Sequence, residues 1–147
     1  MIPIAWTQNA CLLAGRFLLG LYFILPGISK ITGYAGTAAY MAEHNVPMIA
    51  VLLPVTIILQ IGLGATMIVG FQGRLTAFLL AGMTIVISIY MHNFWDMPEG
   101  TERGHETQNF FKNMGITAGL LTMVSLGSGR FSIDTWLARR KQENIAV

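Results

Sequence analysis

Charged residues are scarce in this sequence. Asp, Glu, Lys and Arg make up 11% of its 147 residues, whereas a soluble globular domain carries about 25%. Because 54% of the residues are hydrophobic, the chain has too few polar side chains to cover a water-facing surface. The composition therefore excludes an ordinary soluble domain and predicts an integral membrane protein.

Cysteine and net charge are equally limited. Cys11 is the single cysteine, which excludes an internal disulfide and a Cys-x-x-Cys redox pair. The net charge of +2 is too small to indicate a nucleic-acid partner. No two of the three histidines have the i, i+4 spacing of a metal-binding helix, so no metal site is predicted. Sequence signatures of haem, flavin and iron–sulfur clusters are absent, and none of these cofactors is expected.

Four hydrophobic stretches divide the chain, at about residues 10–31, 46–73, 75–95 and 110–127. A helix needs about 20 residues to cross the hydrocarbon layer of a membrane, and each stretch reaches or approaches that length. A polar loop at 96–108 separates the last two. The sequence therefore predicts an all-α protein with one transmembrane domain over residues 1–147, built as a four-helix bundle.

The segment 128–147 differs from the stretches before it. It sets apolar side chains beside basic ones, namely Phe131, Ile133, Trp136 and Leu137 beside Arg139, Arg140 and Lys141. This combination is typical of a short amphipathic segment lying on anionic lipid head groups. We expect an amphipathic C-terminal tail that anchors the bundle to the membrane surface.

Small and polar residues recur at helical spacing within the four stretches. The first carries Arg16, Gly20, Phe23, Gly27 and Lys30, and the third carries Arg74, Ala77, Ala81, Thr84, Ser88 and His92. The second contributes Thr56, Gln60 and Gly64, and the fourth Lys112, Gly115, Gly119 and Thr122. Small residues let membrane helices approach closely, so we expect all four stripes to face the bundle axis.

Charged and polar side chains inside the stretches are the candidates for function. Arg16 lies at least one turn inside its stretch and needs a partner such as Gln60 or a backbone carbonyl. Lys30 and Lys112 lie near helix ends, where they either line a site or extend to the interface. For Gln60, an interhelical hydrogen bond is a better explanation than a role in a site. His92 ends a polar stripe and is well placed to hydrogen bond a ligand.

Five short motifs follow one another along nearly the whole chain. They are Gly15-Arg16-Phe17-Leu18-Leu19-Gly20 with Pro26-Gly27-Ile28-Ser29-Lys30-Ile31, Gly73-Arg74-Leu75-Thr76-Ala77, His92-Asn93-Phe94-Trp95, Gln108-Asn109-Phe110-Phe111-Lys112-Asn113 and Gly127-Ser128-Gly129. In this order the sequence resembles the DoxX family. The resemblance implies a four-helix inner-membrane protein of the kind associated with quinone-linked oxidation of sulfur compounds or quinol.

The resemblance also implies a set of functional positions: Arg16, Lys30, His92, Lys112 and Asn113. Many members of the family carry a glutamate in the second helix where this chain has Gln60. A buried arginine–carboxylate pair is therefore not available at that position.

Two kinds of function fit these observations. The first is an accessory subunit of a quinone-linked oxidoreductase system, which binds a quinone near the outer membrane face. The quinone oxygens would face Lys30, His92, Lys112 or Asn113, and the ring would lie among Tyr22, Phe23, Phe94, Trp95 and Phe110. Because the chain has no electron carrier, this role needs another membrane or periplasmic subunit.

The second is a non-enzymatic scaffold or assembly subunit, in which the polar stripes only pack helices. The bilayer, a partner subunit or a second copy of the chain are the expected contacts in this case. Transport of a small molecule is less well supported, because four helices without an inverted repeat leave little room for an alternating-access site.

The distribution of basic residues predicts the orientation. Five basic residues fall on one side of the predicted spans, namely Arg74, Arg130, Arg139, Arg140 and Lys141, and three on the other, namely Lys30, Arg103 and Lys112. Cytoplasmic loops carry the excess of Lys and Arg, so both termini are expected in the cytoplasm. Reporter fusions after Gly33, Gly73, Pro98 and Val147 test this. A loop near Pro98 that is protected from an external label would contradict it.

Overall fold

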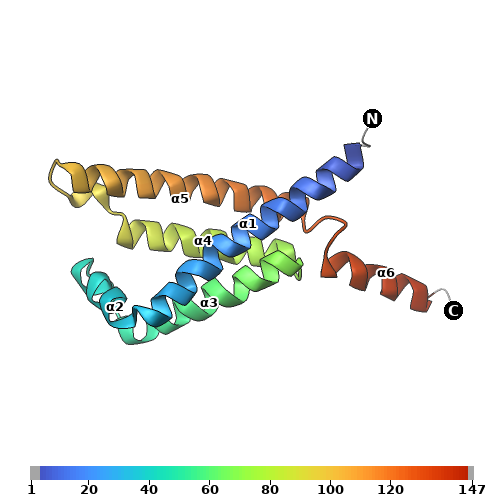
Figure 1. Cartoon of the computed structure of the whole chain (residues 1–147), viewed down its shortest axis with the longest axis horizontal. Coiled ribbons are helices and arrows are strands. Elements are labelled where there is room, and N and C mark those ends of the chain that lie inside the picture. Colours follow the sequence, from blue (N-terminus) through green and yellow to red (C-terminus); the bar gives the residue numbers. More distant parts are fainter. Residues whose placement is uncertain (1–3, 146–147) are drawn as a thin grey trace.

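The computed structural model describes residues 4–145, and these residues form helices joined by short connections (Figure 1). The elements are α1 (Ile4–Thr32), α2 (Tyr34–Glu43), α3 (Ile49–Val69), α4 (Gly73–Met91), the short 3₁₀ helix η1 (Phe94–Asp96), α5 (Thr101–Leu126) and α6 (Ile133–Ile145). The described part of the chain contains no strand, which confirms the all-α prediction.

The four long helices form two antiparallel pairs. Helix α1 packs along α3, and α4 packs along α5, while a tight turn joins α3 to α4 (Figure 1). The start of α1, the α3–α4 turn and α6 lie at one end, called the α6 end below. Helix α2, η1 and the start of α5 lie at the opposite end, called the α2 end.

The helix bounds differ from the predicted stretches in several places. Helix α1 begins at Ile4 instead of near residue 10, and α4 ends at Met91 instead of near residue 95. The second stretch is helical only over Ile49–Val69, because Met48 and Gly70 both adopt left-handed backbone conformations at its ends. Helix α5 begins at Thr101, so most of the predicted loop at 96–108 is helical. Helix α2 lies in a segment between two predicted stretches. It is short, it ends at Glu43 and it has no side-chain cap at its start, so the sequence gives little signal for it.

Close contact between α1 and α3 depends on glycine. A Cβ atom built on Gly20 would overlap Cγ1 of Ile68 and lie 2.6 Å from the carbonyl oxygen of Gly64. A Cβ built on Gly64 would lie 2.9 Å from the carbonyl oxygen of Gly20. The two backbones therefore touch at this crossing, as expected for small residues at a membrane-helix interface. The predicted role of the α1 stripe is confirmed.

The predicted role of the α5 stripe is wrong. A Cβ atom built on Gly115 or Gly119 would meet no atom within 4 Å, and Lys112 is exposed. Helix α5 instead buries Asn113, Thr117 and Leu120, a face turned by about 100° from the predicted one. The physical reason is a buried hydrogen bond. Asn113, one residue after Lys112, donates to Ser88 of α4, and this contact turns its face of α5 inward.

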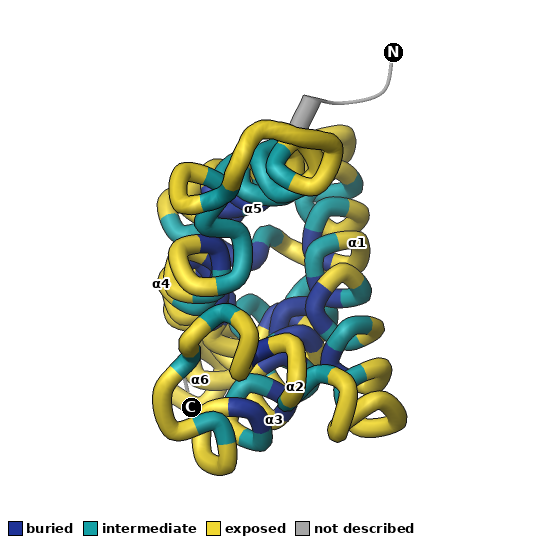
Figure 2. Tube along the Cα trace, turned by 90° about the vertical axis from the view of Figure 1, so that its left-hand side faces the viewer, coloured by how far each residue is buried: buried dark blue, intermediate teal, exposed yellow. Residues whose placement is uncertain are grey.

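Apolar side chains fill the bundle in two clusters. The larger one joins all four long helices near the middle and the α6 end, and its buried members are Phe23, Met67, Ala77, Leu80, Ala81, Leu120 and Met123. The smaller one lies at the α2 end and consists of Met41, Leu53 and Ile57. Figure 2 shows the buried residues on the inner sides of the helices. Helix α2 thus caps the bundle through Met41.

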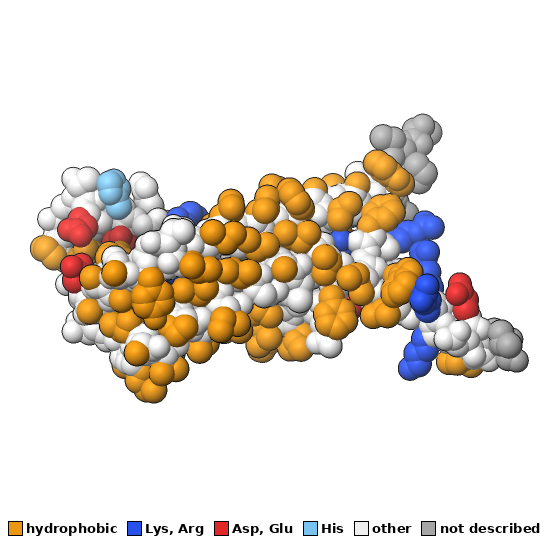
Figure 3. All heavy atoms as spheres, turned by 60° about the horizontal axis from the view of Figure 1, so that its bottom comes forward, with side chains coloured by type: hydrophobic (Ala, Val, Ile, Leu, Met, Phe, Trp, Pro, Cys, Tyr) orange, Lys and Arg blue, Asp and Glu red, His pale blue; other side chains and the backbone are white. Residues whose placement is uncertain are grey.

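The outer surface of the bundle suits lipid. Large apolar side chains such as Phe17, Leu18, Ile58, Phe78 and Val86 are exposed on it, and apolar side chains are distributed along the face shown in Figure 3. By length and composition, three segments of the described chain can cross a membrane: Trp6–Thr32, Ile49–Val69 and Gly73–Asp96. Charged side chains gather near the two ends of the molecule (Figure 3).

Helix α5 is not among these three segments, because its first third is polar. Its remaining part nevertheless lies beside α4. Asn113 is hydrogen bonded to Ser88, and Met123 shares a cluster with Ala77. Residues 113–123 therefore lie at the depth of residues 77–88, and a membrane crossed by α4 also surrounds this part of α5.

The α1–α3 crossing generates a stability prediction. Gly20→Ala places a methyl group against a backbone oxygen that cannot move away, so we expect it to destabilise the protein by about 1–3 kcal/mol. Gly62→Ala on α3 is the matched control, because a Cβ there meets no atom within 4 Å. Thermal unfolding in detergent measures both. Equal melting temperatures for the two variants would contradict the close contact.

Candidate functional site

Arg16 is buried near the α6 end and holds the segment that precedes α6. Its side chain is 1% exposed. Nη1 donates a hydrogen bond to the carbonyl oxygen of Ser128 at 2.6 Å, and Nη2 donates to that of Phe131 at 2.5 Å. Pairing with backbone carbonyls was one of the two predicted arrangements. The planar guanidinium suits two acceptors held side by side.

Gly70 makes room for this guanidinium. A Cβ atom at Gly70 would overlap Nη1 of Arg16, and the residue has a left-handed backbone with φ 68°. Both conditions favour glycine. The turn between α3 and α4 is therefore shaped around the buried cation.

Asp134 completes the α6 end from the first turn of α6. Its carboxylate accepts hydrogen bonds from the backbone N–H groups of Gln72 and Gly73 at 2.7 and 2.9 Å, and from the Ser128 hydroxyl at 2.7 Å. The carboxylate thus caps the N-terminus of α4. Burial alone would raise the pKa of this carboxyl, but these donors and the charge of Arg16 bring the pKa below its ordinary value.

A second polar group lies midway along the bundle. The Asn113 amide donates to the Ser88 hydroxyl at 3.0 Å, and that hydroxyl donates to the Thr84 carbonyl oxygen at 2.7 Å. The Tyr22 hydroxyl donates to Oδ1 of Asn113 at 3.0 Å. Because Asn113, Ser88 and Thr84 are all buried, this chain of hydrogen bonds joins α1, α4 and α5 inside the membrane.

Two buried polar atoms in the described chain have no hydrogen-bond partner at this depth, Oε1 of Gln60 and Oγ1 of Thr117. Gln60 packs against α1, where its Cβ lies 3.2 Å from the position that a Cβ on Gly27 would occupy. The predicted pair between Gln60 and Arg16 does not form. Arg16 is engaged by Ser128 and Phe131 instead, nearer the α6 end.

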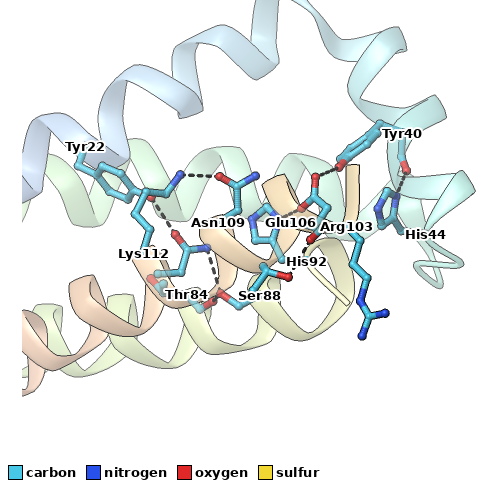
Figure 4. Close-up of polar contacts among 12 residues, drawn as sticks. Tyr22, Tyr40, His44, Thr84, Ser88, His92, Arg103, Glu106, Asn109 and Lys112 are labelled. Atoms are coloured by element: carbon cyan, nitrogen blue, oxygen red, sulfur yellow. Dashed lines mark hydrogen bonds and ion pairs between the residues drawn. The ribbon is translucent and has the colours of Figure 1, made fainter. Parts of the chain in front are cut away.

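At the α2 end, His92 and Glu106 form an ion pair between the end of α4 and α5. Nδ1 of His92 lies 2.5 Å from Oε2 of Glu106, and the two side chains are 18% and 13% exposed. The Tyr40 hydroxyl donates to Oε1 of Glu106 at 3.5 Å. Figure 4 shows Tyr40, Glu106 and His92 meeting from α2, α5 and α4. Burial and the nearby Glu106 carboxylate raise the pKa of Tyr40.

A pocket of about 440 Å³ opens beside this ion pair, between α1, α2 and α4. Lys30 and His92 contribute polar groups to it together with Ser29, Thr37 and Tyr40, and its apolar wall comes from Pro26, Ile87 and Met91. Nζ of Lys30 lies 3.5 Å from the Pro26 carbonyl oxygen of its own helix. We call this space the head pocket. It combines a cation, a histidine held by a carboxylate and three hydroxyl groups.

The structure brings together only part of the predicted site. Lys30 and His92 share the head pocket. Asn113 lies deeper, on Ser88, and Lys112 is exposed and donates to Oδ1 of Asn109 at 2.9 Å. Arg16 belongs to the α6 end, and Gln60 to the α1–α3 interface. The aromatic residues Phe94, Trp95, Phe110 and Phe111 contact one another and do not line the pocket.

Tyr40 was not predicted from the sequence, because it lies in a helix that was not expected. Glu106, like Glu102, was expected as a carboxylate beside Lys30 and Lys112, whereas in the structure it pairs with His92. A signal for Glu106 exists in the helical spacing of Glu106, Asn109 and Asn113. These three residues continue one polar face of α5 toward the α2 end.

Comparison with known proteins relates this chain to one family of membrane proteins. The DoxX family model matches residues 11–93. Inner membrane protein YqjF of Escherichia coli K12 is 36% identical over 133 residues, which cover 90% of this chain and 96% of that protein. Inner membrane protein YphA of the same organism is 31% identical over 87% of this chain and 91% of its own length.

A more distant relative is the surfeit locus protein 4 homolog of Schizosaccharomyces pombe. It is 32% identical over 78 residues, which cover 52% of this chain and 26% of that protein. No solved structure matches the chain.

The Arg16 contacts generate a second stability prediction. Arg16→Leu leaves one buried and one partly buried carbonyl group without donors. An unpaired buried group costs about 1–3 kcal/mol and a partly buried one costs less, so we expect a loss of about 2–5 kcal/mol. Arg74→Leu is the control, because Arg74 is an exposed arginine at the same end of the bundle. Arg16→Lys should fall between them, since an ammonium cannot hold both acceptors in the same plane. An Arg16→Leu protein as stable as Arg74→Leu would contradict the prediction.

Proposed function

The chain belongs to the DoxX family of integral membrane proteins, and we propose that it is a membrane subunit that binds a quinone-like molecule for a quinone-linked oxidoreductase system. The observation that supports this is the head pocket, where Lys30 and His92 meet beside apolar side chains. Ligand sites in membrane proteins combine such an apolar wall with a few converging polar groups. A purely structural helix end has no need of this combination.

His92 has the chemistry to recognise both redox states of a quinone. With Nδ1–H donated to the Glu106 carboxylate, the neutral imidazole presents Nε2 as an acceptor for a quinol hydroxyl. A protonated imidazole presents Nε2–H as a donor for a quinone carbonyl. In either form His92 keeps its hydrogen bond to Glu106 and offers Nε2 to one oxygen of the ligand.

Lys30 supplies the second recognition group. An ammonium beside a quinone oxygen attracts the electron density that develops there on reduction. Its own bond, to Pro26 at 3.5 Å, is long, which leaves its remaining donors for a ligand. Ile87 and Met91 supply the apolar surface for the ring.

The same proposal requires a partner. The sequence has no haem, flavin or iron–sulfur signature, so electrons reach or leave the quinone through another membrane or periplasmic subunit. We place the protein in the inner membrane with both termini in the cytoplasm. Two relatives named as inner membrane proteins and the basic side chains near α6 (Figure 3) support this orientation and location.

A scaffold without a ligand is the second candidate, and one observation favours it. Gly20, Gly64, Ser88 and Asn113 are all accounted for by contacts between helices. Such contacts need no bound molecule. They do not account for Lys30 and His92, which line a pocket rather than a helix interface.

Ligand binding distinguishes the two candidates. We expect the protein, purified in native lipid discs, to retain extractable quinone and to bind a ubiquinone with one isoprene unit. Lys30→Gln and His92→Gln should each weaken this binding about tenfold, the loss of roughly one hydrogen bond to a charged group. Lys112→Gln, an exposed lysine outside the pocket, is the control. If the wild-type protein binds no quinone, or if both pocket variants bind it as well as the wild type, the ligand-binding proposal is wrong and the scaffold role remains.

A further inference from the structure

A second cavity lies on the other side of α4, and it differs in chemistry from the head pocket. It is a groove of about 580 Å³ between α3 and α4, which also reaches Met41 of α2. Apart from the hydroxyl groups of Thr56 and Tyr90, its lining side chains are apolar, and they include Leu59, Leu63, Phe78 and Val86. We call it the tail groove.

The two cavities share a wall. Ile87 and Met91 of α4 line both of them, and neighbouring residues of α2 line one each, Tyr40 the head pocket and Met41 the tail groove. Helix α2 therefore covers both spaces at the α2 end. The partition between them contains the flexible side chains of Met41 and Met91, which adapt readily to a neighbouring apolar group.

We propose that the ligand of the head pocket is an amphiphile with a long apolar tail, and that this tail lies in the tail groove. The inference rests on the proposed function. The polar pocket and the apolar groove lie on either side of Ile87 and Met91, so one molecule whose polar head lies in the pocket and whose apolar tail passes between these side chains is complementary to both. A small polar solute would contact only the head pocket. An acyl chain of the bilayer would contact only the tail groove and would make no polar contact with Lys30 or His92.

The shape of the groove supports an extended occupant. Its lining residues run along α4 from Phe78 to Met91 and along α3 from Leu52 to Leu63, which is about 20 Å at the helical rise. Gly82 lies in the middle of this run, and a Cβ atom there would meet no atom within 4 Å. A chain lying along the groove would contact the backbone of α4 at that point.

The expected contribution of the tail is modest. The bilayer is about as apolar as the groove, so moving the tail between them gains packing rather than hydrophobic free energy. We expect the tail to strengthen binding by about three- to tenfold when concentrations are expressed per lipid. The head pocket, in contrast, decides whether the molecule binds at all.

Filling the groove tests the proposal. Gly82→Leu should weaken binding of a ubiquinone with a full-length isoprenoid tail about three- to tenfold. It should leave binding of the ubiquinone with one isoprene unit within about twofold. Gly62→Leu on α3 is the matched control, because Gly62 also has free space around it but does not line the groove. If Gly82→Leu changes neither affinity, or weakens both equally, the tail does not lie in the groove.

A photoreactive probe gives an independent measurement on the wild-type protein. A long-tailed ubiquinone with a diazirine on its tail should label peptides of α3 and α4 that line the groove. Labelling spread over α1 and α5 would overturn the proposal. So would equal labelling of the groove by a diazirine phospholipid that the quinone does not displace. Failure of the proposed function has a different signature, because then the ubiquinone with one isoprene unit does not bind the wild-type protein.

Discussion

The hydrocarbon layer offers no hydrogen bonds, so a polar group inside it must find its partners within the protein. This constraint organises the bundle at three depths. Arg16 is held by two backbone carbonyls at the α6 end, Asn113 is held by Ser88 midway, and His92 is held by Glu106 at the α2 end. The Arg16 contacts join residues that are 112 and 115 positions apart in the sequence, whereas the other two contacts join α4 to α5. The rotation of α5 follows from the same constraint, because Asn113 rather than Gly115 faces inward.

The two halves of the bundle are held together in different ways. Helices α1 and α3 touch through glycine, with backbone against backbone at Gly20 and Gly64. Helices α3 and α4 meet closely near their shared turn and leave a groove farther along. Close packing on one side therefore accompanies open space on the other. The head pocket and the tail groove both lie where α2 covers this less tightly packed region.

Much of this architecture can be predicted from the sequence, and the exceptions have physical causes. Long apolar stretches predict α1, α3 and α4, and the glycines of α1 predict its contact with α3. Helix α2 is too short to produce such a signal. On α5, small residues and Asn113 lie on adjacent faces, so spacing alone does not decide which face is buried. Of the candidate site, Lys30 and His92 line one pocket, whereas Lys112 and Asn113, which were expected beside them, lie outside it. The tail groove depends on the distance between α3 and α4. This distance is set by the packing of the whole bundle and cannot be predicted from the residues of either helix alone.

The Arg16 contacts also bear on how the protein is made. Arg16 leaves the ribosome early, whereas its partners Ser128 and Phe131 follow 112 and 115 residues later. Throughout that interval the cation has none of its final acceptors and must stay with water or lipid head groups near the membrane boundary. The two hydrogen bonds of Arg16 can therefore form only after the segment before α6 has been synthesised. The bundle is therefore completed late, when α1 becomes hydrogen bonded to the segment before α6.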